Sequence, residues 1–103
     1  MDKILGLREI LALDPNSSFA RYGLAMELAS RGDTAAALAE FDALLANDPN
    51  YTAGYFMAAQ TLAGAGKKQE AIERLKAGIH CAAHCGNNHA AKEMQEMLEE
   101  LGP

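Results

Sequence analysis

The chain has 103 residues, half of them apolar, and nine Lys and Arg residues against fourteen Asp and Glu residues give a formal net charge of −5. This length fits one domain with a modest core. The acidic balance argues against nucleic acid and anionic membranes as partners, because like charges repel. No apolar run approaches the roughly 18–20 residues that cross a bilayer, and the N-terminus lacks the pattern of a signal peptide, so we expect a cytoplasmic protein.

The first predicted helix covers residues 2–13. Alanine and leucine dominate the chain, and both residues lose little entropy in a helix, so helices are expected throughout. Leu7, Ile10 and Leu11 are predicted to pack on the helix that follows. The sequence then breaks at Asp14-Pro15, since proline cannot continue a helical ladder.

Residues 17–50 read as two helices. Asn16 or Ser17 can cap the first helix, and Gly32-Asp33 ends it because glycine readily adopts the left-handed conformation. The second helix carries an apolar stripe at helical spacing, and Pro49 follows its end. The residues of that stripe are Ala37, Phe41, Leu44 and Leu45.

Residues 51–85 repeat this pattern 34 residues later. Asp14-Pro15-Asn16 recurs as Asp48-Pro49-Asn50, and Gly32 recurs as Gly66. The second repeat has Ala83 where a further proline would fall, so its last helix is predicted to run on to about His84 or Cys85. Other matched pairs are Ala25 with Ala59, Leu28 with Leu62, Ala37 with Ala71, Tyr22 with Phe56, and Phe41 with Leu75.

The 34-residue period resembles the tetratricopeptide repeat. The resemblance is carried by Leu24, Ala25, Leu28, Gly32, Ala37, Phe41 and Pro49 in the first copy, and by Tyr55, Ala59, Leu62, Gly66, Ala71 and Leu75 in the second. It implies a single all-α domain over residues 1–103, built as a right-handed α–α superhelix of six antiparallel helices. Residues 2–13 would be half of a leading repeat, and Arg21 departs from the family by replacing the usual aromatic residue.

Residues 88–101 are predicted to form a capping helix. Ala90, Met94, Met97, Leu98 and Leu101 make one apolar stripe, with glutamates around the rest of the helix. The last helix of a solenoid needs such a polar outer face.

The resemblance also implies a function. In this family the first helix of each repeat lines a concave groove that holds peptides or helices. The positions expected to bind a partner here are Phe19, Tyr22, Met26, Ala53, Phe56 and Gln60. These side chains are largely apolar, so the expected ligand is an apolar peptide or amphipathic helix of a protein, including a second copy in a homodimer.

Two alternatives concern this groove. The family's carboxylate clamp uses Lys, Asn and Arg, whereas this chain has Tyr22, Met26 and Met57 there, so no binding of Glu-Glu-Val-Asp tails is expected. The N-terminal helix could instead cover Phe19 and Tyr22 and leave a shallow groove without a ligand. A purely structural subunit that only self-associates is a further alternative.

The run IHCAAHCGNNH, residues 79–89, holds three histidines and both cysteines. His80 and His84 lie one turn apart and could share a metal ion, so a metal-binding or redox role for residues 80–89 is the alternative function. The spacing matches no zinc finger or ribbon, and both histidines should point to solvent. Cys81 and Cys85 are expected on one semi-buried flank beside the last helix. We therefore predict no metal or other cofactor.

No catalytic pattern is present. AGAGKK at residues 63–68 lacks the first glycine, the Ser or Thr and the preceding strand of a phosphate-binding loop. No Ser-His-Asp arrangement stands out, so the chain is predicted not to be an enzyme.

Overall fold

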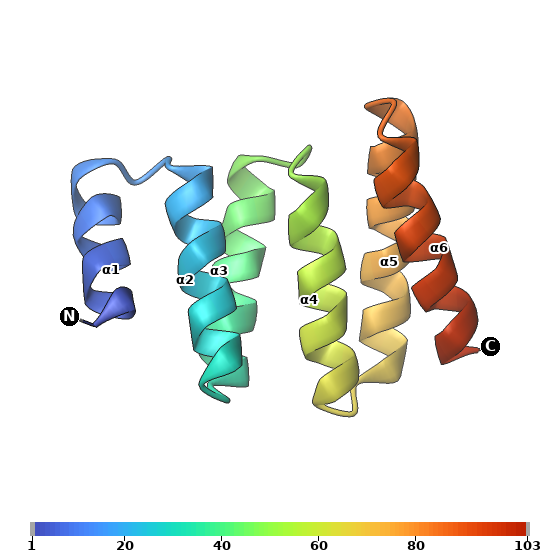
Figure 1. Cartoon of the computed structure of the whole chain (residues 1–103), viewed down its shortest axis with the longest axis horizontal. Helices are drawn as coiled ribbons and strands as arrows, with labels where there is room; N and C mark the ends of the chain where they lie inside the picture. Colours follow the sequence, from blue (N-terminus) through green and yellow to red (C-terminus); the bar gives the residue numbers. More distant parts are fainter. Residues whose placement is uncertain (1, 103) are drawn as a thin grey trace.

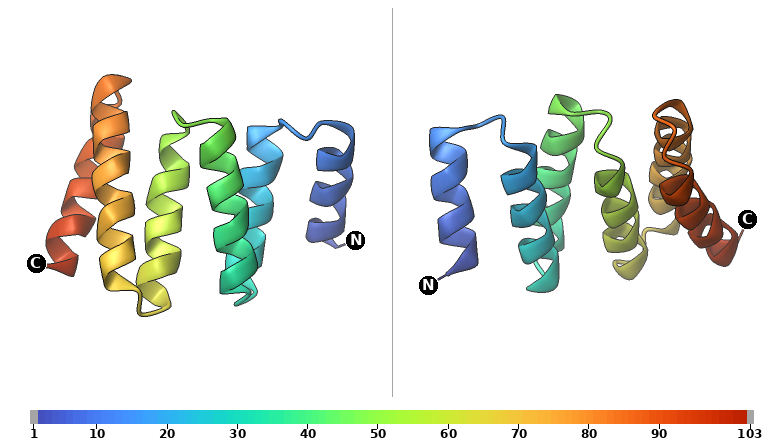
Figure 2. Two further views of the ribbon diagram at one scale, coloured as in Figure 1. Left: turned by 180° about the vertical axis from the view of Figure 1, so that it is seen from behind. Right: turned by 45° about the horizontal axis from the view of Figure 1, so that its top comes forward.

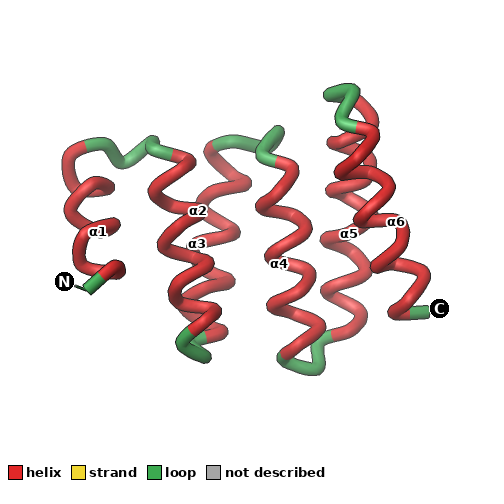
Figure 3. Tube along the Cα trace, viewed as in Figure 1, coloured by secondary structure: helices red, strands yellow, loops and turns green. Residues whose placement is uncertain are grey.

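The computed structural model describes residues 2–102, and within this range the chain forms six helices and no strand (Figures 1 and 3). The helices are α1 (Lys3–Leu13), α2 (Ser18–Ser30), α3 (Thr34–Asn47), α4 (Thr52–Gly64), α5 (Lys68–His84) and α6 (Asn88–Leu101). Each helix packs antiparallel against the next in sequence order, so the predicted all-α solenoid is confirmed.

The helices form two layers. α2, α4 and α6 lie on one face of the stack and α3 and α5 on the other, as the views from the front and from behind show (Figures 1 and 2). The stack measures 40 × 30 × 19 Å along its principal axes. None of the helices in residues 2–102 combines the length and the apolar character that crossing a membrane requires.

The helix ends follow from local sequence. Ser17, Asp33 and Asn87 precede α2, α3 and α6, and each side chain accepts a hydrogen bond from the backbone N–H three residues further on. Gly32 and Gly66 follow α2 and α4 with φ of +83° and +80°, a conformation that glycine adopts without strain.

Buried side chains form two clusters along the stack. The first joins α2, α3 and α4 through Leu24, Ala25, Leu28, Ala37, Phe41, Leu44 and Ala58. The second joins α4, α5 and α6 through Ala59, Leu62, Ala71, Leu75, Ala82 and Met94. All four residues of the predicted α3 stripe are buried. Each large apolar side chain in these clusters contributes about 1.5–3 kcal/mol by leaving water.

Arg21 and Tyr55 occupy equivalent positions in the two repeats and make equivalent contacts. Arg21 Nη2 donates to the carbonyl oxygen of Pro15 at 3.1 Å, and the Tyr55 hydroxyl donates to the carbonyl oxygen of Pro49 at 2.8 Å. Arg21 Nη1 also lies 2.7 Å from Oε1 of Glu40 on α3. Arg21, which replaces the usual aromatic residue of the family, thus links the start of α2 to the preceding turn and to α3.

α1 forms the N-terminal edge of the stack and contains no buried residue. Leu7 and Leu11 pack against the first cluster as predicted, and Ile4 joins them. The prediction for Ile10 was wrong, because its side chain is 48% exposed. At 100° per residue, Ile10 lies on the other side of Leu7 from Ile4 and Leu11, so it faces away from α2.

Candidate functional site

Side chains of α2, α4 and α6 line a trough along one face of the stack. We use the name "trough" for the hollow between α2 and α4 together with the two hollows between α4 and α6. The α2–α4 hollow has a volume of about 430 Å³. It is lined by Met26, Ala29, Ser30, Thr34, Met57, Gln60, Thr61 and Gly64.

The α4–α6 side of the trough has two smaller hollows. One, of about 210 Å³, is lined by Thr52, Ala53, Phe56, Asn87, His89, Ala90 and Glu93. The other, of about 280 Å³, is lined by Phe56, Gln60, Glu93, Glu96, Met97 and Glu100. Gln60 borders hollows on both sides of α4, so it stands at the middle of the trough.

The predicted partner-binding residues divide into two groups. Met26, Ala53, Phe56 and Gln60 line the hollows of the trough, whereas Phe19 and Tyr22 lie outside them. Phe19 is 81% exposed, so the N-terminal helix does not cover it.

Tyr22 is half-buried and contributes to packing. Its ring meets Phe41 edge-on, with centroids 6.5 Å apart, and lies 5.2 Å from the ring of Tyr51. Burial raises the pKa of the Tyr22 hydroxyl above its ordinary value. Tyr22 therefore packs α2 against α3 and against the residue that precedes α4.

Charge is distributed unevenly along the trough. α4 carries no charged residue from Thr52 to Gly64. Three carboxylates line the opposite wall, those of Glu93, Glu96 and Glu100 on α6. His89 Nε2 lies 3.1 Å from Oε1 of Glu93 at the end of this wall.

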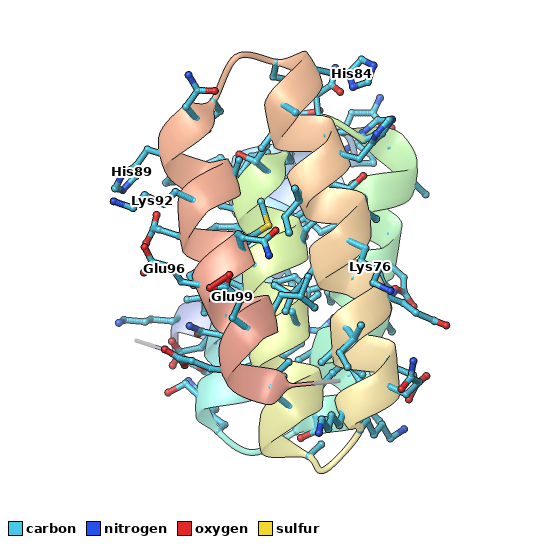
Figure 4. All side chains as sticks on the ribbon, turned by 90° about the vertical axis from the view of Figure 1, so that its right-hand side faces the viewer. Lys76, His84, His89, Lys92, Glu96 and Glu99 are labelled. Carbon is cyan, nitrogen blue, oxygen red and sulfur yellow. The ribbon has the colours of Figure 1, made fainter. Side chains whose placement is uncertain are left out.

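Figure 4 shows the molecule from the α6 end. His89, Lys92 and Glu96 project from α6 on the side away from α5, whereas Glu99 lies nearer α5. Lys92 does not line the hollows, so the charges that border the α4–α6 side are mainly negative.

Of the His and Cys residues in 80–89, His80 and His84 lie close together. The rings of His80 and His84 lie 4.3 Å apart, and His84 Nδ1 is 3.1 Å from the carbonyl oxygen of His80. Both histidines are exposed, as predicted. Within residues 2–102, no three side chains of His, Cys, Asp and Glu come together as a metal site would require.

The two cysteines differ from each other. Cys81 is buried, and its Sγ lies 3.2 Å from the carbonyl oxygen of Pro49 in the α3–α4 connection. Burial, followed by the neighbouring Cys85 thiol, raises the pKa of Cys81. The expectation of a shared semi-buried flank was wrong for Cys85, which is exposed.

Comparisons with known proteins agree with this architecture. The sequence model of the tetratricopeptide repeat matches residues 28–98. The chain belongs to the tetratricopeptide repeat family. A tetratricopeptide repeat-containing protein of Pseudomonas aeruginosa is 30% identical over 98 residues, which are 95% of this chain and 93% of the relative.

Two solved tetratricopeptide-like structures extend the comparison. A solution structure from Bordetella parapertussis superposes with a TM-score of 0.85 and 27% identity, covering 98% of this chain and 88% of that one. YrrB, described as a tetratricopeptide protein with an unusual peptide-binding site, has a TM-score of 0.71 and 30% identity over 84% of this chain and 45% of its own. Tetratricopeptide repeats generally serve protein–protein interaction and are generally non-catalytic.

Sequence reasoning missed part of the tetratricopeptide trough. It treated residues 88–101 as a cap with a solvated acidic face, and it did not place Glu93, Glu96 and Glu100 on the trough wall. The equivalence of α6 to α2 and α4 was hard to see in the sequence because the spacing changes. α2 and α4 begin 34 residues apart, at Ser18 and Thr52, whereas α4 and α6 begin 36 residues apart. The longer α5 shifts α6 out of the repeat period, which hides its equivalence to α2 and α4.

Proposed function

We propose that this protein is an interaction module that holds an apolar or amphipathic helical segment of another protein in the trough. The trough itself supports this most strongly, because methionines from three helices (Met26, Met57 and Met97) and Phe56 line its hollows. Met26 and Met57 lie on opposite walls of the α2–α4 hollow. Methionine side chains repack readily around different apolar ligands, and aromatic residues supply large contact area.

Phe19 is also exposed, and its spacing of seven residues from Met26 puts both on the same side of α2. Large apolar side chains left in water commonly mark interaction sites. YrrB, which shares 30% identity, is described as having a peptide-binding site, and this agrees with a peptide ligand here. The trough lacks a cluster of basic side chains among its lining residues, so we expect no preference for acidic C-terminal tails.

The experiment uses two tryptophan variants that differ in position and not in chemistry. Gln60→Trp fills the middle of the trough, and Ala39→Trp places the same bulk on the exposed surface of α3. A partner is captured by crosslinking, its bound segment is synthesised, and its affinity is measured by calorimetry. We expect Gln60→Trp to weaken binding at least about tenfold, because bulk at the centre of an interface removes its best contacts.

Ala39→Trp is expected to leave the affinity within about twofold, since rim and remote residues contribute little. Both variants should keep the melting temperature of the parent, because both positions are exposed. Equal affinity of all three proteins for the segment would place the binding site elsewhere and refute the proposal.

A further inference from the structure

The two sides of the trough differ in polarity: the α2 and α4 side is apolar, and the α6 side is acidic. The α2 and α4 walls offer Met26, Met57 and Phe56, while Glu93, Glu96 and Glu100 border the α6 side. We propose that the preferred ligand is an amphipathic helix of a partner protein that carries Lys or Arg beside its apolar face. This inference rests on the proposed function and adds the charge of the ligand to it.

The three glutamates are poorly neutralised by the protein itself. Among residues 2–102, the one ion pair formed by these carboxylates joins Glu93 to His89, and that pair is charged only when the histidine is protonated. The charged residues of α2 are engaged elsewhere: Arg21 pairs with Glu40 on α3, and Glu27 pairs with Arg31. Lys92 projects from the same side of α6 as Glu96, but within residues 2–102 it forms no ion pair with these carboxylates. A cationic side chain of a ligand would therefore meet a wall of net negative charge.

The apolar floor and the acidic wall are adjacent. Phe56 and Met97 line the same hollow as the three glutamates, and Gln60 connects it to the methionine-lined hollow. A ligand helix can thus bury apolar side chains on Phe56 and the methionines while a Lys or Arg stem lies along Met97 and its head group reaches a carboxylate. Long basic side chains combine an apolar stem with a charged head in this way.

Charge also favours a partner over a second copy of this chain. The protein has a net charge of −5, so a copy docking with an acidic helix in the trough would bring like charges together. Juxtaposed like charges suppress wrong partners, and complementary charges speed association. The occupant we infer is therefore a basic segment of a different protein.

The test uses three synthetic helical peptides with the same leucine face. Their polar faces carry lysine, glutamine or glutamate, and their binding to the protein is followed by fluorescence anisotropy. We expect the lysine peptide to bind about tenfold more tightly than the glutamine peptide, and the glutamate peptide more weakly than both. Raising the salt from about 0.05 M to 0.5 M should reduce the difference, because salt screens exposed charges.

Two triple variants with the same change in net charge provide the control. Glu93→Gln/Glu96→Gln/Glu100→Gln should lose the preference for lysine while binding the glutamine peptide as before. Glu9→Gln/Glu73→Gln/Glu99→Gln removes three exposed carboxylates outside the trough and should keep the preference. Equal effects of the two triple variants, or equal binding of the lysine and glutamate peptides, would overturn the inference.

The outcomes separate this inference from the proposed function. If the glutamine peptide binds and Gln60→Trp abolishes its binding, but lysine gives no advantage, the trough binds helices and the charge preference is wrong. If no peptide binds the parent protein, both proposals fail. Sedimentation experiments test for a second copy. If the protein self-associates and the lysine peptide reverses this association, a second copy occupies the trough, and the inference of a basic segment from a different protein is wrong.

Discussion

At the scale of single residues, Cys81 and Cys85 show how neighbours decide the chemistry of a side chain. The two residues lie about 40° apart around a helix, so the sequence placed them on one flank. Cys81 lies inside α5, where the Pro49–Asn50 turn between α3 and α4 covers its thiol. Cys85 follows the last residue of α5 and is exposed.

Thiol reactivity should therefore differ between the two cysteines. With iodoacetamide at about pH 8, near the ordinary pKa of a thiol, we expect Cys85 to be alkylated at least about ten times faster than Cys81. Burial blocks access to Cys81, and the raised pKa of Cys81 lowers its thiolate fraction. Mass spectrometry of the labelled peptides measures both rates. In urea the rates should converge, and equal rates in the native protein would contradict the burial of Cys81.

At the scale of helices, the close packing of α5 against α4 and α6 depends on Gly78. A Cβ added to Gly78 of α5 would lie 2.5 Å from Met94 Sδ and 2.6 Å from Tyr55 Cβ. Tyr55 Cβ is attached directly to the α4 backbone, so it cannot move aside without shifting the helix. Gly78 thus sets the distance of α5 from both α4 and α6, and it does so at the cost of a weaker helix propensity.

Gly78→Ala should destabilise the protein by about 1–3 kcal/mol, because overpacking outweighs the gain in helix propensity. Gly64→Ala is the matched control, since nothing lies within 4 Å of its added Cβ. That variant should be neutral or more stable by up to about 1 kcal/mol. Urea unfolding followed by circular dichroism measures both changes. A stable Gly78→Ala variant would show that α5 can move outward freely.

At the scale of the whole molecule, stability is expected to vary along the stack. α1 has no buried residue and packs on one neighbour, α2. α3, α4 and α5 have neighbours on both sides and contribute most of the buried side chains, together with α2. A solenoid's stability is roughly a sum over units and their contacts, so an edge helix opens before the central ones.

Hydrogen exchange should reveal this gradient. Amides in the middle of α1 are expected to exchange at least about ten times faster than those in the middle of α4, because α1 contributes no buried residue to either core cluster. Leu7→Ala should speed exchange in α1 further, since Leu7 contacts the first cluster, and should leave α5 unchanged. Uniform protection across α1 and α4 would indicate that the whole chain opens as one unit.

The helices and their buried stripes were predictable because the signals are local. Pro49, Gly32 and Gly66 end segments through their own backbone preferences, and the α3 stripe from Ala37 to Leu45 follows from helical spacing alone. The trough was predictable only in part. Met26 and Phe56 follow from the family resemblance, whereas the placement of Glu93, Glu96 and Glu100 depends on how far α5 extends.

The sequence by itself determined the six helices, their order and their 34-residue repeat, because turn residues and apolar periodicity act within a few residues of each other. Only the tertiary structure decided which exposed side chains share a surface. α6 comes to lie beside α4 because both pack on α5, and that contact brings its glutamates to the trough. The same holds for Cys81, whose thiol is covered by a turn more than thirty residues away.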